Sequence, residues 1–341
     1  MFGFARPSLL QTAPQQAMRS AVPAQAAQGA WMQREEAIMG TAIAVELWAE
    51  DHTAGEAAIS AVMAEMHRID HAMSPHKPTS ELSRINRGAA AGPVALGAEM
   101  LELLARAERF AKITEGAFDI SYAAIGRLYD YRLRLRPSAA ELAAAQAAVG
   151  YRHVQLDLLA KTVRFTHPGT CIDLGGFAKG HAVDQAAAIL RSHGIRHAHV
   201  SAGGDSRVIG DRRGRPWSIG IRDPRRPGEL VAVLPLQDTS VSTSGDYERC
   251  FVENGVRYHH LIDPSSGRSP DAVCSVTVLG EDGLTTEALS KAVFVRGVEQ
   301  GMRLIDSYVG VDAIVVDAAG QLHYSRGLQA AMNVHPPAPT R

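Results

Sequence analysis

The alternation of apolar and polar residues along the chain predicts many short strands and fewer helices. In "GTAIAVELWA", Ile43, Val45 and Leu47 would lie on one side of a strand and the intervening residues on the other. Further strands are predicted in "HVQLD", "TVRF", "CIDL", "HAHVSAGGD", "WSIGIRD", "LVAVLPL", "SVSTS", "RYHHLID" and "SVTVLG", with a closing hairpin in "DAIVVDAAGQLHYS". Because strands and helices mix without strict βαβ alternation, the pattern indicates an α+β fold with mixed sheets and packed helices.

Capping signals and helical spacing predict helices over residues 53–69, 99–114, 138–150, 178–193 and 286–295. The first of these helices opens with a capping box of Thr53 and Glu56, and the third with a capping box of Ser138 and Glu141. The segment "SPHKPTSELSRIN" is expected to be a loop, and order is expected to begin near Met39.

The N-terminal segment is rich in Ala, Gln and Pro, and it has no apolar run long enough for a signal-peptide core or a membrane span. We expect a mobile leader over residues 1–36, one domain over 37–330 and a C-terminal tail over 331–341. The sequence as written favours a cytoplasmic location, although "AVPAQAAQ" is similar to the small-residue end of an export signal.

Charge and cysteine content narrow the function classes. The chain has 35 basic and 36 acidic residues, so its formal net charge is −1 and no general attraction to nucleic acid or to an anionic membrane is expected. The three cysteines, Cys171, Cys250 and Cys274, are too few and too scattered for a disulfide framework or a zinc site.

The stretch "CIDLGGFAKGHAVDQ" has two interpretations. It is read as a strand that stops at Asp173, turns on Gly175 and Gly176, and leads into a helix whose first turn carries Lys179. The turn either only connects the strand to the helix or binds a phosphate group. Phosphate binding is possible because glycines allow a ligand to approach the backbone and a helix start offers free N–H groups.

Two other glycine turns are open to the same alternatives. "SAGGDSRVIGD" places Asp205 after a second Gly-Gly pair, either in a solvated hairpin or in a second turn that approaches a ligand. "STSGDYERCF" has hydroxyls before a glycine, which are most often local backbone caps, and it lacks the Gly-x-Ser-x-Gly pattern of a hydrolase.

Two more motifs carry titratable residues. In "RYHHLIDPSSG", His259 and His260 would point to opposite faces of a strand, so at most one of them is functional, and Asp263 is held extended before a proline. In "TTEALSKAVFV", Glu287 and Lys291 have helical i, i+4 spacing, which by itself suggests an exposed ion pair of about 0.2–0.5 kcal/mol.

Taken in order, these segments resemble the FAD:protein FMN transferase family, the ApbE-type flavin transferases. The resemblance runs over roughly residues 37 to 330, through "MGTAIAVEL", "SELSRIN", "GAFDIS", "DLGGFAKGHAVD", "AGGD", "TSGDYER", "YHHLIDPSSG" and "TTEALSKAVFVRG". It implies an α+β fold that binds FAD and transfers its FMN half to a Thr or Ser of an acceptor protein, with release of AMP and a requirement for Mg²⁺.

The resemblance also implies roles for individual residues. Flavin-nucleotide contacts are expected at Met39, Ala117, Phe118, Asp119, Asp173, Lys179 and Ile262, and also at His76, where a flavin-stacking tyrosine is common. Gly176 falls at a metal position that a backbone carbonyl could serve. A base is needed near the acceptor hydroxyl, and His260 and Asp263 are the candidates.

The chain departs from the family at the metal site. Where the family usually has Asp and Thr four residues apart as metal ligands, this chain has Glu287 and Lys291. An ammonium at the threonine position would repel a divalent cation unless it turns to solvent or itself supplies the positive charge, so weakened Mg²⁺ binding is expected.

Two further functions stay open at this point. The same site could hydrolyse FAD to FMN and AMP with water, or it could bind FAD without catalysis. The relatives of such a protein often work outside the cytoplasmic membrane, which makes a periplasmic location the family-based alternative.

Overall fold

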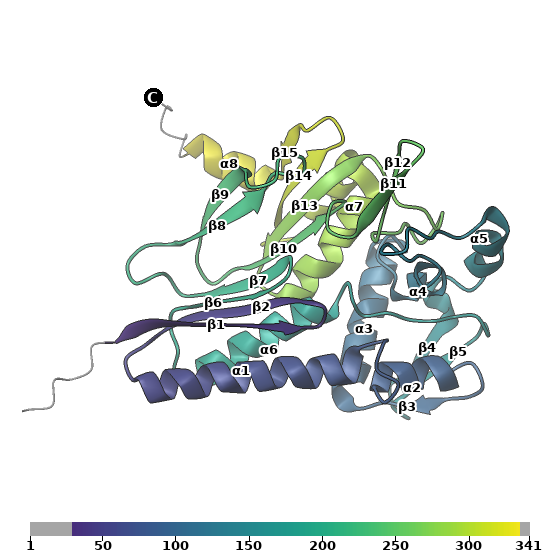
Figure 1. Cartoon of the computed structure of the whole chain (residues 1–341), viewed down its shortest axis with the longest axis horizontal. Coiled ribbons are helices and arrows are strands. Elements are labelled where there is room, and N and C mark those ends of the chain that lie inside the picture. Colours follow the sequence, from purple (N-terminus) through teal and green to yellow (C-terminus); the bar gives the residue numbers. More distant parts are fainter. Residues whose placement is uncertain (1–28, 335–341) are drawn as a thin grey trace, which may run out of the picture.

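The computed structural model describes residues 29–334. The protein is built around one large antiparallel sheet (Figure 1). Its strand order is β1-β2-β6-β7-β10-β13-β14-β15, and each recorded pair is antiparallel. The strands are β1 (Ala30–Ile38), β2 (Thr41–Ala49), β6 (Ala198–Ala202), β7 (Asp205–Ile209), β10 (Ser240–Gly245), β13 (Val273–Gly280), β14 (Asp312–Asp317) and β15 (Leu322–Tyr324).

Three smaller sheets complete the strand inventory of the described residues. A three-stranded sheet has the order β3-β5-β4, and two hairpins are formed by β8 with β9 and by β11 with β12. Their bounds are β3 (Val94–Ala95), β4 (Val154–Asp157), β5 (Thr162–Phe165), β8 (Trp217–Arg222), β9 (Leu230–Leu236), β11 (Cys250–Glu253) and β12 (Val256–His259).

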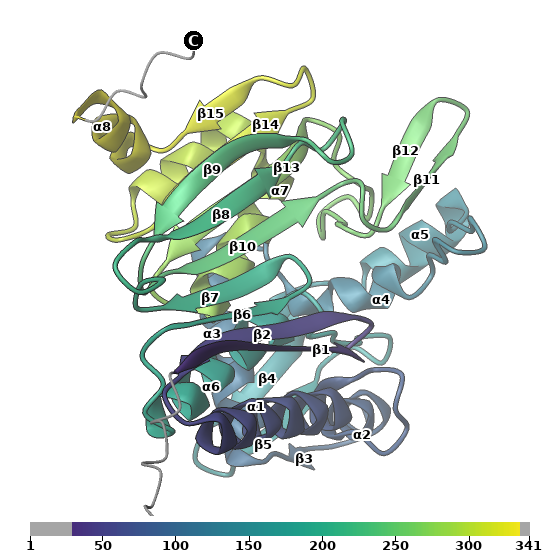
Figure 2. The same ribbon diagram turned by 60° about the vertical axis from the view of Figure 1, so that its left-hand side comes forward.

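Helices cover one face of the large sheet, as Figures 1 and 2 show for α1, α6 and α7. α1 packs on β1 and β2, α6 on β6 and β7, and α7 on β10, β13 and β14. The helices are α1 (His52–Met73), α2 (Glu81–Gly88), α3 (Ala98–Ile113), α4 (Ala123–Gly126), α5 (Ala139–Gln146), α6 (Ala178–Ser192), α7 (Gly283–Asp306) and α8 (Arg326–Val334), with short 3₁₀ turns η1 (Ile120–Tyr122) and η2 (Tyr151–His153).

The apolar pattern explains this arrangement. In β2, Ile43, Val45 and Leu47 are at most 1 % exposed and face the helices, as the alternation predicts. β13 is buried along its whole length, because it lies between β10 and β14 in the middle of the sheet. The predicted α+β fold is confirmed.

The helix starts test the capping predictions. The capping box of Ser138 and Glu141 is present and opens α5, although this helix ends at Gln146 and not at Gly150. α1 begins one residue earlier than predicted because the Asp51 side chain, and not Thr53, accepts the capping hydrogen bond, from the Ala54 N–H at 2.7 Å.

The predicted structures of two segments were wrong. "SPHKPTSELSRIN" contains α2, because the Ser80 hydroxyl caps it by accepting from the Ser83 N–H at 3.0 Å and Leu82 and Ile85 are buried. "CIDL" is not a strand. The Ile172 N–H donates to the Asn86 side chain of α2 at 2.9 Å and the Asp173 N–H donates to the Ile120 carbonyl of η1 at 3.0 Å, so this segment does not pair with another strand.

The leader was expected to extend further along the chain than the structure allows. β1 pairs with β2 along its full length, from Ala30 opposite Ala49 to Ile38 opposite Thr41, so order begins well before Met39 and the leader does not reach residue 36. At the other end, α8 continues past residue 330. The rest of the expected leader, residues 1–28, and residues 335–341 of the tail lie outside the described residues.

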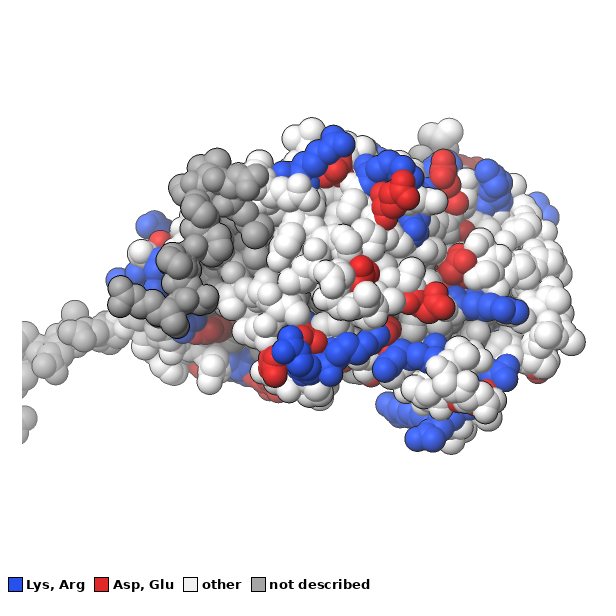
Figure 3. Space-filling view, turned by 90° about the horizontal axis from the view of Figure 1, so that it is seen from above, with Lys and Arg blue, Asp and Glu red and all other residues white. Residues whose placement is uncertain are grey.

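Among the described residues, no helix combines the length and the apolar character needed to span a membrane. On the face shown in Figure 3, basic and acidic side chains are interspersed and separated by uncharged areas. This mixture agrees with the formal net charge of −1.

Candidate functional site

The candidate site forms where the start of α6 packs against the start of α7. A Cβ atom added to Gly180 would lie 2.2 Å from the Gly283 carbonyl oxygen, so the two helices approach more closely than a side chain would allow. The Asp184 carboxylate of α6 caps α7 by accepting from the Gly283 N–H at 2.8 Å. This contact places Glu287, one turn further along α7, beside the first turn of α6.

Four charged side chains meet there, which we call the lysine–carboxylate cluster: Lys179, Asp205, Glu287 and Lys291. The Lys179 ammonium contacts Glu287 Oε1 and lies 3.0 Å from Asp205 Oδ2. The Lys291 ammonium lies 3.1 Å from the same Glu287 Oε1. Asp205 and Glu287 are 2 % and 0 % exposed, whereas the two lysine side chains are 21 % and 18 % exposed and thus reach the surface.

Burial and mutual attraction shift the cluster's pKa values. Burial disfavours the Lys179 ammonium, but the carboxylates of Asp205 and Glu287 outweigh it and raise the pKa of Lys179 above its ordinary value. Burial lowers the pKa of Lys291, and the positive charge of Lys179 lowers it further. The carboxylates of Glu287 and Asp205 raise this pKa but only partly offset the lowering. For Asp205, burial is opposed and exceeded by the two ammoniums, so its pKa is lowered.

A serine hydroxyl of β10 holds the Asp205 carboxylate and links it to a serine of α7. The Ser242 hydroxyl donates to Asp205 Oδ1 at 2.5 Å and lies 3.2 Å from the Ser290 hydroxyl, which donates to the Glu287 backbone carbonyl at 2.9 Å. Ser244 reaches Ser290 at 2.9 Å. The expectation that these hydroxyls are local caps was wrong, and so was the alternative of a solvated Asp205.

The start of α6 already faces a carboxylate from within the chain. The Gly180 N–H donates to Glu287 Oε2 at 2.7 Å, and the preceding turn is closed by the Gly175 N–H, which donates to Asp173 Oδ1 at 2.5 Å. Part of the predicted phosphate cradle therefore serves Glu287 and Asp173. The Lys179 ammonium also donates to the Gly175 carbonyl oxygen at 2.9 Å, so its three donors all have partners and the Lys291 ammonium is the cation of the cluster with donors left for an anion.

His260 lies directly after β12 and close to both lysines. Burial, with the positive charges of Arg249, Lys291 and Lys179 in support, lowers its pKa to about 3, so its imidazole is neutral near neutral pH. Its Nδ1 atom is buried and has no hydrogen-bond partner among the described residues. A neutral imidazole with a free ring nitrogen can accept a proton from an incoming hydroxyl.

The neighbouring His259 has a structural environment. It is 1 % exposed, its Nε2 lies 2.8 Å from the Pro270 carbonyl oxygen, and its ring meets the edge of Phe294 at 5.4 Å. The Nδ1 atoms of both histidines are buried without a hydrogen-bond partner among the described residues, but His259 is buried whereas His260 is partly exposed, so His260 stays the candidate.

Two predicted site carboxylates are engaged in folding their own turns. Asp263 accepts hydrogen bonds from the Ser265 N–H at 2.9 Å and from the hydroxyls of Ser265 and Ser266, the latter at 2.7 Å. Asp119 accepts from Ser121 and from the Tyr151 N–H at 2.6 Å. Burial raises the pKa of Asp119 despite these donors. Because Asp263 is so fully bonded, His260 is the better candidate base.

The other residues expected to contact a nucleotide differ in their packing and exposure. The Phe118 ring packs 5.3 Å from Phe177 in an aromatic core, Ile262 is buried, and Ala117 packs against the core. Met39 occupies the β1–β2 turn with a positive φ of 54°, and His76 is exposed. The side chains of Phe118 and Ile262 face the interior, so their contact with a ligand stays a prediction.

The cluster does not fit a metal ion as it is arranged. Within residues 29–334, no three or more His, Cys, Asp or Glu side chains are placed so as to hold one. The nearest carboxylates, Asp205 and Glu287, are bonded to ammoniums. A Cβ at Gly176, the other expected metal position, would lie 3.3 Å from Lys291 Cε, so the lysine side chain packs on that turn.

Sequence reasoning left the role of Asp205 open and missed the side chains around it. Asp205 had a signal in its Gly-Gly-Asp turn, where Gly204 passes so close to Thr243 that a Cβ would lie 2.4 Å from the Thr243 carbonyl oxygen. Tyr122 and Arg249 had no such signal. The charge of Asp173, followed by burial, raises the pKa of Tyr122 well above its ordinary range.

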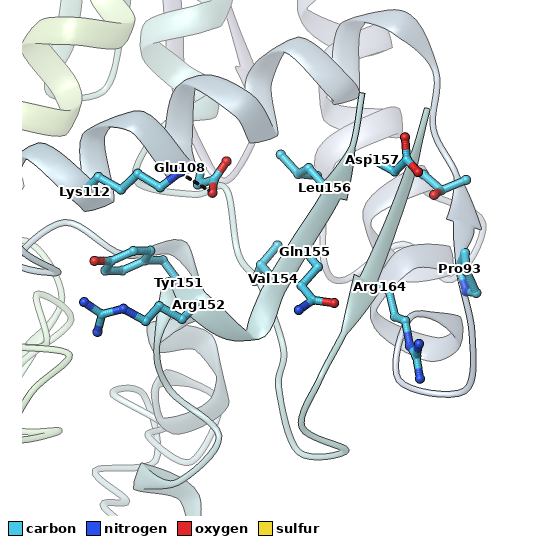
Figure 4. A pocket seen from close by; sticks show the side chains of 11 residues that line it. Pro93, Glu108, Lys112, Tyr151, Arg152, Val154, Gln155, Leu156, Asp157 and Arg164 are labelled. Atoms are coloured by element: carbon cyan, nitrogen blue, oxygen red, sulfur yellow. Dashed lines mark ion pairs between the residues drawn. The ribbon is translucent and has the colours of Figure 1, made fainter. Parts of the chain in front are cut away.

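A hollow in the described surface lies elsewhere. It measures about 710 Å³ and is lined by α3, η2, β4 and β5, with the Glu108–Lys112 ion pair at 2.6 Å on its wall (Figure 4). None of the predicted site residues lines this hollow. Its size alone therefore does not make it the candidate site.

The fold and the site together define a class: an α+β protein with a lysine–carboxylate cluster near a neutral histidine. Residues 39–315 match the model of the ApbE family, and the chain belongs to that family. It is 35 % identical to the FAD:protein FMN transferase of Rhodobacter capsulatus over 76 % of this chain, and it spans about half, 49 %, of that relative's length. It is 31 % identical to the FAD:protein FMN transferase of Treponema pallidum, over 86 % of this chain and 87 % of that one.

Solved structures of the family have the same fold. The ApbE protein of Thermotoga maritima superposes with a TM-score of 0.82 at 32 % identity, over 88 % of this chain and 99 % of that chain. The flavin transferase ApbE of Vibrio cholerae superposes with a TM-score of 0.79 at 27 % identity, over 89 % of this chain and 99 % of that chain.

Proposed function

We propose that this protein is an FAD:protein FMN transferase. It binds FAD and transfers the FMN moiety through a phosphoester bond to a Thr or Ser of an acceptor protein, releasing AMP. Family membership and the names of the relatives support this proposal. The observation that carries it is the convergence of two lysine ammoniums and the neutral His260 imidazole at one partly exposed place.

The chemistry required is transfer of a phosphoryl group with a positively charged setting and a base. The acceptor hydroxyl oxygen attacks the phosphorus of the FMN half, and the bond from that phosphorus to the bridging oxygen breaks. AMP leaves with the bonding electron pair, and the ammoniums of Lys179 and Lys291 stabilise the negative charge that develops. The neutral imidazole of His260 takes the proton of the attacking hydroxyl.

The remaining contacts to FAD are proposed from the resemblance. Asp173 lies in the turn before α6, at the edge of the cluster, and Met39 and His76 are accessible enough to meet a flavin. Asp119 and Phe118 would act by shaping the site, because their side chains are engaged within the chain. Participation of Mg²⁺ stays a prediction of the resemblance.

The test is to incubate the pure protein with FAD, with and without a flavin-accepting domain, and with either Mg²⁺ or EDTA. Release of AMP together with covalent flavin fluorescence on the acceptor is the expected result. Release of AMP and FMN without labelled acceptor would favour an FAD pyrophosphatase. Binding of FAD with no AMP under any condition would favour a non-catalytic flavin-binding protein, an alternative that the presence of Lys291 in the cluster supports.

A further inference from the structure

Lys291 bridges the two positions at which the resemblance places a metal ion. Its ammonium lies 3.1 Å from Glu287 Oε1 on α7, and its Cε atom packs on Gly176 in the turn before α6. The side chain thus passes between Glu287 and Gly176. A positive charge that belongs to the chain therefore lies beside both residues.

The charges in the cluster are already balanced. Two carboxylates, Asp205 and Glu287, face two ammoniums, Lys179 and Lys291. Both oxygens of Glu287 have donors, because Oε1 pairs with the lysines and Oε2 accepts from the Gly180 N–H at 2.7 Å. A divalent ion would have to displace an ammonium or lie next to two of them in a poorly solvated place.

We propose that the Lys291 ammonium takes the place of a divalent cation in this site. Together with Lys179 it binds the diphosphate of FAD, so that FAD binding does not require Mg²⁺. The inference rests on the proposed function, since that function names FAD as the ligand.

The bonding of Lys291 supports this role. An ammonium has three donors, and the hydrogen bond recorded for Lys291 among the described residues uses one of them, toward Glu287. The side chain is 18 % exposed, so a ligand can reach it. A diphosphate placed there would favour the charged form of the lysine and offset the burial that disfavours it.

The test compares wild type with Lys291→Thr, Lys291→Met and Lys112→Thr. Lys291→Met keeps the length of the side chain without its charge, and Lys112→Thr is the matched control, because Lys112 also pairs with a glutamate four residues before it but is 59 % exposed. Affinity for FAD is measured by flavin fluorescence in Mg²⁺ and in EDTA. Binding of Mn²⁺ without FAD is measured by electron paramagnetic resonance.

In wild type and in Lys112→Thr, the affinity for FAD should be the same in Mg²⁺ and in EDTA, and no specific Mn²⁺ site should be detected. Loss of a charge-assisted hydrogen bond should weaken FAD binding by Lys291→Met about 10–100-fold in EDTA. Lys291→Thr should show the same loss in EDTA, gain a Mn²⁺ site and recover FAD affinity when Mg²⁺ is added.

The outcomes separate this inference from the proposed function. If wild type binds FAD tightly only when Mg²⁺ is present, or binds Mn²⁺ as well as Lys291→Thr does, the inference is wrong and the proposed function stands. If wild type binds no FAD in either condition, both are wrong as stated. The Mn²⁺ titration then still shows whether Lys291 keeps a divalent ion out of the cluster.

Discussion

Helices α3 and α7 each carry a glutamate followed four residues later by a lysine, and the two pairs lie in opposite surroundings. Glu108 and Lys112 of α3 are 34 % and 59 % exposed and pair at 2.6 Å on the wall of the large hollow (Figure 4). Glu287 and Lys291 of α7 are 0 % and 18 % exposed and pair at 3.1 Å within the lysine–carboxylate cluster. The same local sequence pattern thus yields a solvated surface pair in one helix and part of a candidate active site in the other.

The difference shows that burial and convergence decide how strongly paired charges affect one another. The hollow near Glu108 measures about 710 Å³, yet the Glu108 and Lys112 side chains on its wall are partly exposed. In the cluster, four charges from α6, β7 and α7 meet where water is scarce, so each charge strongly perturbs the others. The predictions that follow compare matched changes in these two regions.

The largest expected effect is on catalysis and uses one histidine from each region. Replacing His260 with alanine should lower the rate of flavin transfer by about 10²–10⁴-fold, because the attacking hydroxyl loses its proton acceptor. His153, at the end of η2 beside the hollow, hydrogen-bonds Thr166 at 2.9 Å and lies outside the cluster. His153→Ala should keep the wild-type rate, measured as acceptor fluorescence against time.

Both histidine variants need a binding control. Affinity for FAD should be retained in His260→Ala, because the lysines that meet the diphosphate are intact. A rate for His260→Ala within a factor of about three of wild type would show that another group accepts the proton, since a general base contributes far more than that.

A second comparison concerns stability. Glu287→Gln removes a buried charge that pairs with both lysines, and it should lower the free energy of unfolding by about 3 kcal/mol, as breaking a buried ion pair does. Glu108→Gln should change the free energy of unfolding by less than about 0.5 kcal/mol, because an exposed pair contributes little. Urea denaturation followed by circular dichroism measures both values. Equal losses would mean that the cluster is as well solvated as the surface pair.

The third comparison concerns pH. The pKa of His260 falls from 6.5 to about 3 on folding. At pH values between these two, the imidazole is protonated in the unfolded chain and neutral in the folded protein. The stability that the neutral imidazole contributes is therefore complete above pH 6.5 and is lost as the pH falls toward 3. One such group adds a slope of up to about 1.4 kcal/mol per pH unit to the free energy of unfolding.

His260→Asn should remove this slope, and urea titrations at several pH values between neutral and acidic would measure it. Burial also lowers the pKa of His259, so the variant should retain part of the acid sensitivity of wild type. His153→Asn is the control from the other region. A slope in His260→Asn as steep as in wild type would show that the acid sensitivity arises elsewhere.

Much of the fold could be predicted from the sequence because local patterns dominate in the large sheet. Alternation in β2 and the capping box of α5 are short-range signals, and the structure has both. β1 escaped detection because its middle, Gln33–Glu36, is a run of polar and charged residues, and pairing with β2 gives it order that its own sequence does not signal. α2 was missed because its apolar positions are few and its cap, Ser80, lies among turn residues.

The site was less predictable because its contacts join distant parts of the chain. Lys179, Glu287 and Lys291 stood out in their own motifs, and the resemblance gave these residues and His260 their expected roles. The pairing of Lys179 with Asp205, the burial of Ser242 and the proximity of Arg249 to His260 depend on how the strands and helices pack. Asp119 and Asp263 illustrate the converse, since a carboxylate in a recognisable motif can be engaged in folding its own turn.

The smallest expected effect is the coupling between Glu108 and Lys112, and it defines the exposed end of the comparison. A double-mutant cycle with Glu108→Ala and Lys112→Ala should give a coupling energy of about 0.2–0.5 kcal/mol. The coupling should vanish at about 1 M salt, where the screening length shrinks to about 3 Å. The same cycle at Glu287 and Lys291 should give a larger value that persists in salt, because ions cannot enter the space between the buried carboxylate and its partner. If salt removed both couplings alike, the burial of the cluster would have no electrostatic consequence, and Lys291 could not act there as a fixed positive charge.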